Sequence, residues 1–247
     1  MTAPVPKTLA SETLMEMGKL VLAMEKYMAQ DDERLLAWDA EIDKFLVTHP
    51  VEAQLCLTLI AQFQGDWENA EHFIERAAAR GASRAVIDSN RFMIYTNFVL
   101  ATKAQEVAVR SVGIEHGNIT EKIAGILASG AVAHARLLLE QARKGKLDMS
   151  SVTQLDSIEQ ITDHFRDSPV PDARFAAVID CAGEVLRESR LFWLDRSPRL
   201  RLDKGTGCMT LRYRVAVSPD QAAAMTLAAA DKLIERDLCD VPITVGF

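Results

Sequence analysis

The sequence has few of the features that mark membrane, secreted and metal-binding proteins. No apolar run approaches the roughly 18 residues that cross a membrane, and acidic residues interrupt the N-terminal stretch where a secretory signal peptide would be apolar. The four cysteines are scattered without a C-x-x-C spacing, so they predict neither a disulfide framework nor a zinc site. We therefore expect a cytoplasmic protein that enters no membrane and holds no metal or cofactor.

Common catalytic motifs are also absent. The chain contains no phosphate-binding loop, dinucleotide-binding glycine motif, nucleophile elbow or zinc-protease helix. His72 and His134 have no set of neighbouring ligands, and a solvated helix end accounts for Asp163, His164 and Asp167. These absences favour a non-enzymatic protein without excluding an enzyme.

The composition is that of a protein with a real core. Of the 247 residues 49% are hydrophobic, and the mean hydropathy is +0.01, so large-scale disorder is not expected. The formal net charge of −7 and the pI of about 5.3 argue against attraction of the whole surface to nucleic acid or anionic lipid.

The stretch from Leu55 to Ala78 is the clearest structural signal. Two apolar runs with helical spacing flank a single break at Gly65 and Asp66, as two antiparallel helices with a very short turn require. Small residues at Ala70 and Ala77 would let the second helix approach its neighbour closely. This pattern predicts a helical hairpin.

The hairpin resembles one tetratricopeptide repeat, with Leu57 on its first helix and the turn and small residues where that family has them. It departs from the family at Gln54 and Ala61, where a large residue and a tyrosine are usual, and no proline closes the unit near Ala82. The resemblance implies antiparallel helical hairpins that stack around a groove for a peptide or protein partner.

Other helices are expected on both sides of this hairpin. An earlier hairpin is predicted from Leu9–Met28 and a helix that Asp31 or Asp32 caps and that runs to about Val47, and a long helix is predicted for Asp88–Val112. Gly130, Ala135, Leu139 and Ala142 repeat the offsets of Gly65, Ala70, Ile74 and Ala77, which suggests a second hairpin of the same kind or a coincidence between common residues. A last helix of this region is predicted for Met149–Phe165.

The pattern changes after the connector Ser168–Pro171, where two prolines exclude helix. A helix is predicted for Asp172–Ser189, strands at Arg199–Leu202 and Met209–Val215, and a helix from Ser218 to about Leu238. Residues 241–247 are strand-like, and Pro242 must lie either on an edge strand or among the first residues of the strand. A two-residue type II′ loop at Gly205-Thr206 would set Leu202 opposite Met209, Leu200 opposite Leu211 and Arg199 opposite Arg212.

The fold class is therefore mainly α, with N-terminal antiparallel helical hairpins in residues 1–167. A small α+β unit follows in residues 168–247, in the order helix, strand, strand, helix, strand. Its Ala-rich last helix, from Ala222 to Ala230, could pack closely on the apolar face of the hairpin. One compact domain is the alternative.

Basic residues concentrate in the predicted strands. Between Glu184 and Val217 eight basic residues stand against four acidic ones, in a chain that is acidic overall. On the predicted hairpin Arg199, Arg201, Arg212 and Arg214 leave by the face opposite the leucines, with Arg196 and Lys204 nearby. These arginines either pair with the acidic helices or remain in solvent, or they bind phosphate, nucleic acid or an acidic partner.

Arg110 and His116 have the Arg-x₅-His spacing that is similar to that of the all-helical nucleases called HEPN domains. The resemblance implies an RNA-cleaving pair, but Ser111 departs from the amide or acid that usually follows the arginine. Gly113 would also interrupt the helix that should present the pair. A helix C-terminus at His116 is the ordinary interpretation.

We expect a non-enzymatic protein–protein interaction module, an adaptor, chaperone or assembly component, that binds another protein or peptide in a helical groove. The alternative is a nucleic-acid- or phosphate-associated protein that uses the arginines of the C-terminal hairpin. A homo-oligomer is compatible with either function.

Overall fold

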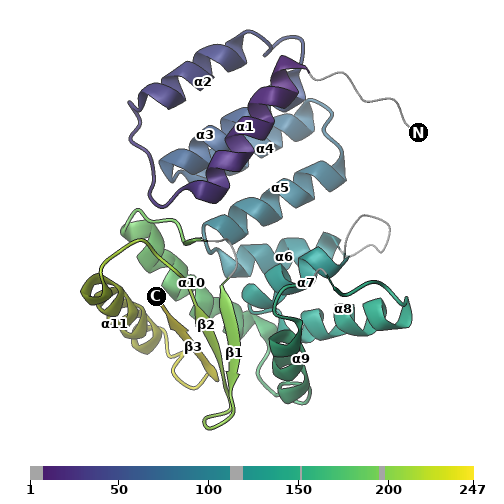
Figure 1. Cartoon of the computed structure of the whole chain (residues 1–247), viewed down its shortest axis with the longest axis vertical. Coiled ribbons are helices and arrows are strands. Elements are labelled where there is room, and N and C mark those ends of the chain that lie inside the picture. The colour runs from purple at the N-terminus through teal and green to yellow at the C-terminus, as the bar shows by residue number, and fades with distance from the viewer. Residues whose placement is uncertain (1–7, 112–118, 151, 195–197) are drawn as a thin grey trace. The chain divides into compact units, whose positions relative to one another are not determined.

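A computed structural model describes residues 8–111, 119–150, 152–194 and 198–247. Within these ranges the chain forms helices and one small three-stranded sheet near its C-terminus (Figure 1). The predicted class, mainly α with a C-terminal α+β unit, is confirmed. No helix among the described residues is long and apolar enough to span a membrane.

The chain divides into two compact units, residues 1–94 and 95–247. The helices of the first are α1 (Leu9–Ala23), α2 (Glu33–Asp43), α3 (Pro50–Gln64), α4 (Trp67–Ala79) and the first part of α5 (Arg84–Asn97). The second contains the end of α5, α6 (Ala101–Ser111), α7 (Ile119–Ala128), α8 (Val132–Lys144), α9 (Leu155–His164), α10 (Asp172–Glu188), β1 (Arg199–Asp203), β2 (Cys208–Arg212), α11 (Pro219–Glu235) and β3 (Ile243–Gly246).

The predicted hairpin is α3 and α4, the most closely packed pair of helices in the first unit. Gly65 ends α3 with a φ of 82°, a left-handed conformation that glycine adopts at little cost. Asp66 then begins α4, because its carboxylate accepts the N–H of Asn69 at 3.0 Å. Ala70 and Ala77 are fully buried, as the close approach of two helices requires.

The predicted first hairpin is wrong. The helix α1 ends at Ala23, five residues before the expected Met28, and a largely non-helical segment separates it from α2. In place of a tight turn, Met28 donates its N–H to the carbonyl of Phe63 at 2.7 Å, so this segment is held by α3. Both α1 and α2 pack mainly on α3 rather than on each other.

The helices α7 and α8 form a second hairpin that repeats the turn geometry of the first. Gly130 has a φ of 81°, and Ala131 donates its N–H five residues back to Ile126, as Asp66 does to Ala61. Ala135 and Ala142 are fully buried, like Ala70 and Ala77. The shared offsets therefore correspond to a shared local structure.

The predicted long helix Asp88–Val112 is also wrong, because the chain breaks it into α5 and α6. Val99, between them, has a φ of 51°, which a β-branched residue rarely adopts. Side chains of α10 stabilise the break through hydrogen bonds to the main chain on both sides of it. The predicted helix Met149–Phe165 is shorter than expected and begins at Leu155, after a left-handed Gln154.

The hairpin β1–β2 has the predicted register, with Leu202 opposite Met209, Leu200 opposite Leu211 and Arg199 opposite Arg212. Its loop is different. Asp203 still pairs with Cys208, and the left-handed residue of the turn is Gly207, with a φ of 70°, not Gly205 as a type II′ turn needs. The strand β3 joins β2 in parallel, at the other edge from β1.

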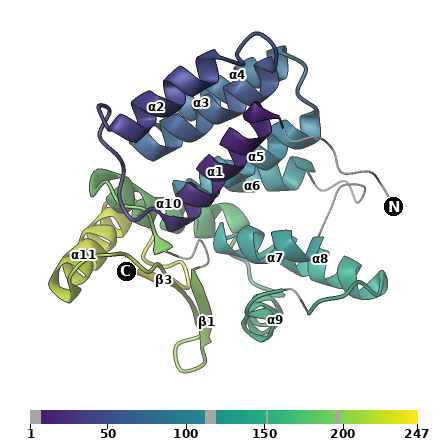
Figure 2. The ribbon, with the colours of Figure 1, turned by 45° about the horizontal axis from the view of Figure 1, so that its top comes forward.

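The last helix, α11, begins with the predicted cap, in which Ser218 accepts the N–H of Gln221 before Pro219 opens the helix. It does not lie across the hairpin as expected. Its main contacts are with α10 and β3, and it runs beside α10 in both views (Figures 1 and 2).

The division between the two units falls at residues 94 and 95, not at the connector Ser168–Pro171, which lies inside the second unit. Helices before the connector share a core with those after it. The helix α10 packs on α6, and α9 packs along β1. The connector itself is non-helical, as its prolines require.

Candidate functional site

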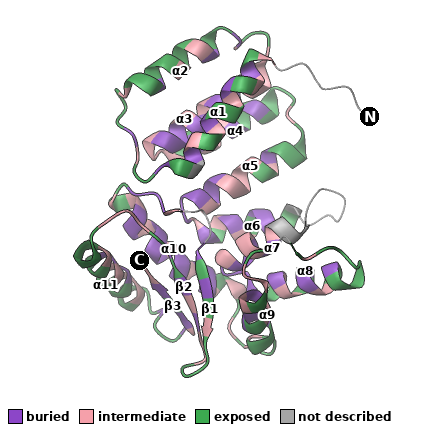
Figure 3. Ribbon diagram, viewed as in Figure 1, coloured by how far each residue is buried: buried purple, intermediate pink, exposed green. Residues whose placement is uncertain are grey.

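The helix α10 is the support on which the C-terminal sheet is built. Its apolar side chains are buried along its whole length, among them Phe175, Val178, Ile179 and Leu186, and it packs on α6, α11 and β3. Figure 3 shows α10 as a mostly buried element. The sheet beside it therefore has one face turned to a core.

Three charged side chains of α10 bind main-chain groups at the ends of other helices. Asp172 accepts the N–H groups of Ala133 at 3.0 Å and His134 at 3.3 Å, and so caps α8. The N-cap residue of α8, Ala131, makes no side-chain cap of its own. Arg187 donates to the carbonyl oxygens of Phe98 and Val99, at 2.6 and 3.3 Å, where α5 ends. Carboxylates thus meet helix N-termini and a guanidinium meets a C-terminus, as the helix dipole favours.

Asp180 lies between these two and caps α6. It accepts the N–H of Ala101 at 2.5 Å and the hydroxyl of Thr102 at 2.5 Å. Burial raises the pKa of the Asp180 carboxyl, and the hydrogen bonds from Thr102 and Ala101 oppose that shift. The arrangement accounts for Asp180 as a structural cap for α6.

The three-stranded sheet has one buried and one exposed face. Met209 and Leu211 are fully buried, and Leu200, Ile243 and Val245 are less than a tenth exposed. The other face carries Arg199, Arg201, Thr210, Arg212 and Thr244, with the arginines and Thr244 exposed. We call the surface formed by Arg199, Arg201 and Arg212 the arginine face.

Few protein groups neutralise the arginine face. Among the described residues, no side-chain carboxylate lies within 4.0 Å of a guanidinium nitrogen of these three arginines. Arg212 donates to the main-chain oxygen of Phe247 at 3.4 Å. Arg199 and Arg212 occupy directly opposite positions on neighbouring strands, where like charges destabilise a sheet.

The carboxylate on this face belongs to Asp203 and is used by the turn. It accepts the N–H of Gly205 at 2.9 Å, and this hydrogen bond is the main reason that the pKa of Asp203 lies below its usual value. The charge of Arg201 contributes a smaller part of the same shift. Asp203 therefore stays ionised and points into the turn.

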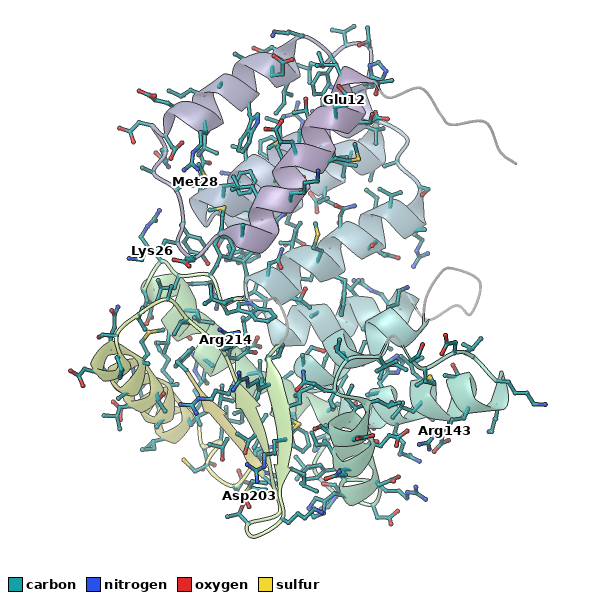
Figure 4. The ribbon with its side chains drawn as sticks, in the orientation of Figure 1. Glu12, Lys26, Met28, Arg143, Asp203 and Arg214 are labelled. Carbon is teal, nitrogen blue, oxygen red and sulfur yellow. The ribbon has the colours of Figure 1, made fainter. Side chains whose placement is uncertain are left out.

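Two other predicted site residues, Arg214 and Lys204, lie at the two ends of the hairpin. Arg214 is exposed just beyond β2, at the end of the hairpin away from Asp203 (Figure 4), and its carbonyl accepts the N–H of Leu194 at 2.6 Å. Lys204 is exposed in the turn. Arg196 falls outside the described residues.

The edge of β1 is closed by a side chain that sequence patterns did not reveal. The amide of Gln154 accepts the N–H of Leu200 at 2.8 Å and donates to the carbonyl of Pro198 at 3.0 Å, as a neighbouring strand would. The ring of His164 lies 3.0 Å from the carbonyl oxygen of Gly207. Gln154 precedes α9 and His164 is its last residue, so α9 holds the hairpin at its edge and at its tip.

No protein-family model, curated protein sequence or solved structure matches this chain. Assignment of a function therefore depends on the site geometry.

Where the structure describes Arg110 and His134, the hydrogen bonds at these positions are with or from the main chain. Arg110 is exposed and donates to the carbonyl of Glu106 at 3.1 Å, while His116 lies outside the described residues. Burial lowers the pKa of His134, whose backbone is bound by Asp172. Within the described ranges, no three His, Cys, Asp or Glu side chains are placed to hold a metal ion.

Sequence patterns did not reveal the three charged residues with which α10 binds the ends of α5, α6 and α8. Their spacing offers a weak signal, because successive members of the set Asp172, Asp180 and Arg187 lie two turns apart on a helix whose other residues are mostly apolar. Charged residues on such a stripe must find partners when the helix is buried. The identity of those partners, helix ends far away in the chain, has no sequence signature.

Proposed function

We propose that this protein is a non-enzymatic interaction protein of the adaptor or assembly type, and that its arginine face binds an acidic segment of a partner protein. The observation that supports this proposal is the exposure of Arg199 and Arg201 on a supported sheet face where no described side-chain carboxylate is paired with them. Guanidinium groups bind carboxylates through paired hydrogen bonds, and Thr244 adds an exposed hydroxyl to the same face.

A bound anionic segment would also relieve a repulsion within the protein. The opposed arginines Arg199 and Arg212 raise the free energy of the unbound sheet. A carboxylate placed between them converts that repulsion into two attractive contacts, which makes the face a better acceptor than two isolated surface arginines.

Phosphate or nucleic acid is the alternative ligand, since the same arginines suit phosphate groups. The chain's formal net charge of −7 disfavours it for long polyanions, because the rest of the surface repels them. A short acidic peptide avoids most of this repulsion. The helical groove expected from the tetratricopeptide-like hairpin stays a prediction.

The test measures binding of a fluorescent oligoglutamate peptide by anisotropy. Replacing Arg199 and Arg201 together by Gln should weaken binding about tenfold or more, because two charge-assisted contacts are lost. The matched control replaces Lys144 and Lys146, two exposed cations at the end of α8, by Gln and should bind as the parent does.

Two outcomes would contradict this proposal. If the arginine variant binds oligoglutamate as tightly as the parent, the arginine face is not the site. If a single-stranded oligonucleotide binds far more tightly than oligoglutamate, with a steep salt dependence that the arginine variant loses, the nucleic-acid alternative is correct.

A further inference from the structure

The helix α11 carries a second apolar stripe that the described residues leave uncovered. Its first stripe, with Met225 and Ala229, is buried. The second consists of Ala223, Leu227, Ala230 and Ile234, all exposed. Leu227 and Ile234 are 67% and 68% exposed, more than any other described leucine or isoleucine, and Figure 3 shows how much of α11 is exposed.

The spacing of this stripe is that of a helix–helix seam. Successive members are four, three and four residues apart, which is the a and d pattern of a coiled-coil heptad. Small and large side chains alternate along it, so a facing helix can approach at the alanines and receive Leu227 and Ile234 between its own side chains. A strand or an irregular loop would match this period poorly.

The charges beside the stripe have one sign. The two cations nearest to it in sequence are held by carboxylates of α10. Lys232 of α11 binds Glu184 at 2.7 Å and Glu188 at 3.0 Å, and Arg236, just after α11, binds Glu184 at 2.5 Å. The exposed half of the helix carries Asp220, Asp231 and Glu235 and no lysine or arginine. The seam is therefore apolar with an acidic border.

We propose that this stripe docks an amphipathic helix of a partner protein whose apolar seam is bordered by lysine or arginine. Complementary charge selects this occupant, because a basic border meets the carboxylates of Asp220, Asp231 and Glu235. A second copy of the chain would add further carboxylates at the same seam, and an anionic membrane would be repelled by those already there. This surface is separate from the arginine face and takes a ligand of opposite charge.

The experiment uses the full chain and two synthetic helical peptides of about three heptads, with leucine and alanine in the seam and either lysine or glutamate along the border. The lysine peptide should bind, and the glutamate peptide should bind about tenfold more weakly or worse. Replacing Leu227 and Ile234 together by Gln should weaken binding of the lysine peptide by a similar factor. The control replaces the exposed Leu137 and Leu147 by Gln and should leave its binding unchanged.

A charge-reversal variant separates docking from general attraction between a cationic peptide and an acidic protein. Replacing Asp231 and Glu235 together by Lys should shift the preference from the lysine peptide toward the glutamate peptide, whereas general attraction would leave the preference in place. The variant with Arg199 and Arg201 replaced by Gln should bind the lysine peptide as the parent does, so failure of the arginine face can be told apart from failure of this surface.

Unchanged binding by the Leu227→Gln, Ile234→Gln variant would overturn the proposal, and so would an unchanged preference after charge reversal. Sedimentation that shows self-association of the parent, lost in the Leu227→Gln, Ile234→Gln variant, would make a second copy the occupant and overturn it too. If the parent binds phosphatidylserine vesicles and the same variant does not, the proposal is also overturned, and the stripe is a membrane-binding surface.

Discussion

At Val99 the main chain adopts a left-handed conformation that costs a β-branched residue of the order of 1–3 kcal/mol. Three residues of α10 offset that cost. Asp180 caps the helix that starts after the break, Arg187 binds the carbonyl oxygens before it, and Gly183 lets the two segments touch. The indole N–H of Trp193 also donates to Asn97 at 3.2 Å. The break is thus a tertiary junction with defined contacts.

Gly183 is required because a Cβ atom there would overlap the carbonyl oxygen of Val99. Gly183→Ala should therefore lower the free energy of unfolding by about 3 kcal/mol, since neither of the two backbones can move easily. Gly18→Ala in α1 is the matched control, because nothing lies within 4 Å of a Cβ built there. It should raise stability by roughly 0.5–1 kcal/mol through helix propensity. Urea denaturation measures both, and equal effects would argue against the junction.

At the scale of elements, the hairpins α3–α4 and α7–α8 have the same kind of tight turn. A left-handed glycine ends the first helix, and two alanines seven residues apart let the second pack closely. They differ at the start of the second helix. In α3–α4 the cap is Asp66, which lies in the turn of the hairpin itself. In α7–α8 the cap is Asp172, which belongs to α10.

A large side chain at the contact between the hairpin helices should be costly. Ala77 is fully buried in α4, so Ala77→Trp should lower the melting temperature by ten degrees or more, roughly what a loss of 3 kcal/mol produces. The neighbouring Ala78 is exposed, and Ala78→Trp is expected to melt within about two degrees of the parent. Thermal unfolding followed by circular dichroism compares them. Similar melting of the two variants would contradict the assigned packing.

At the scale of the whole molecule, the chain consists of two compact units that meet within α5 in the sequence. The first has α3 as its central helix, and the second has α10. Both proposed binding surfaces belong to the second unit. Compact units of this kind are expected to open separately.

Hydrogen exchange followed by mass spectrometry tests this organisation. Gly183→Ala should speed the exchange of amides in α6 and α10 and leave those of α3 and α4 as in the parent. Ala77→Trp should do the reverse, so each variant is the control for the other. Faster exchange throughout the chain in either variant would show a single cooperative unit instead.

Local chemistry made much of this protein predictable from its sequence. Glycine at Gly65 and Gly130 marks where a helix must stop, and the alternation of leucine and arginine determines both the register of β1 and β2 and the face on which the arginines lie. These features depend on residues close together in the chain. For that reason the class of fold and the arginine face could be predicted.

Tertiary structure alone decided the features that depend on distant partners. The helical pattern of residues 88–112 is continuous, yet it breaks at Val99 because Asp180 and Arg187, some eighty residues away, bind the freed main-chain groups. The two apolar stripes of α11 are both helical in period, and packing on α10 and β3 determined that Met225 is buried and Leu227 exposed. Periodicity shows which faces of a segment could be buried. Which face is buried depends on the elements that pack against the segment in the folded protein.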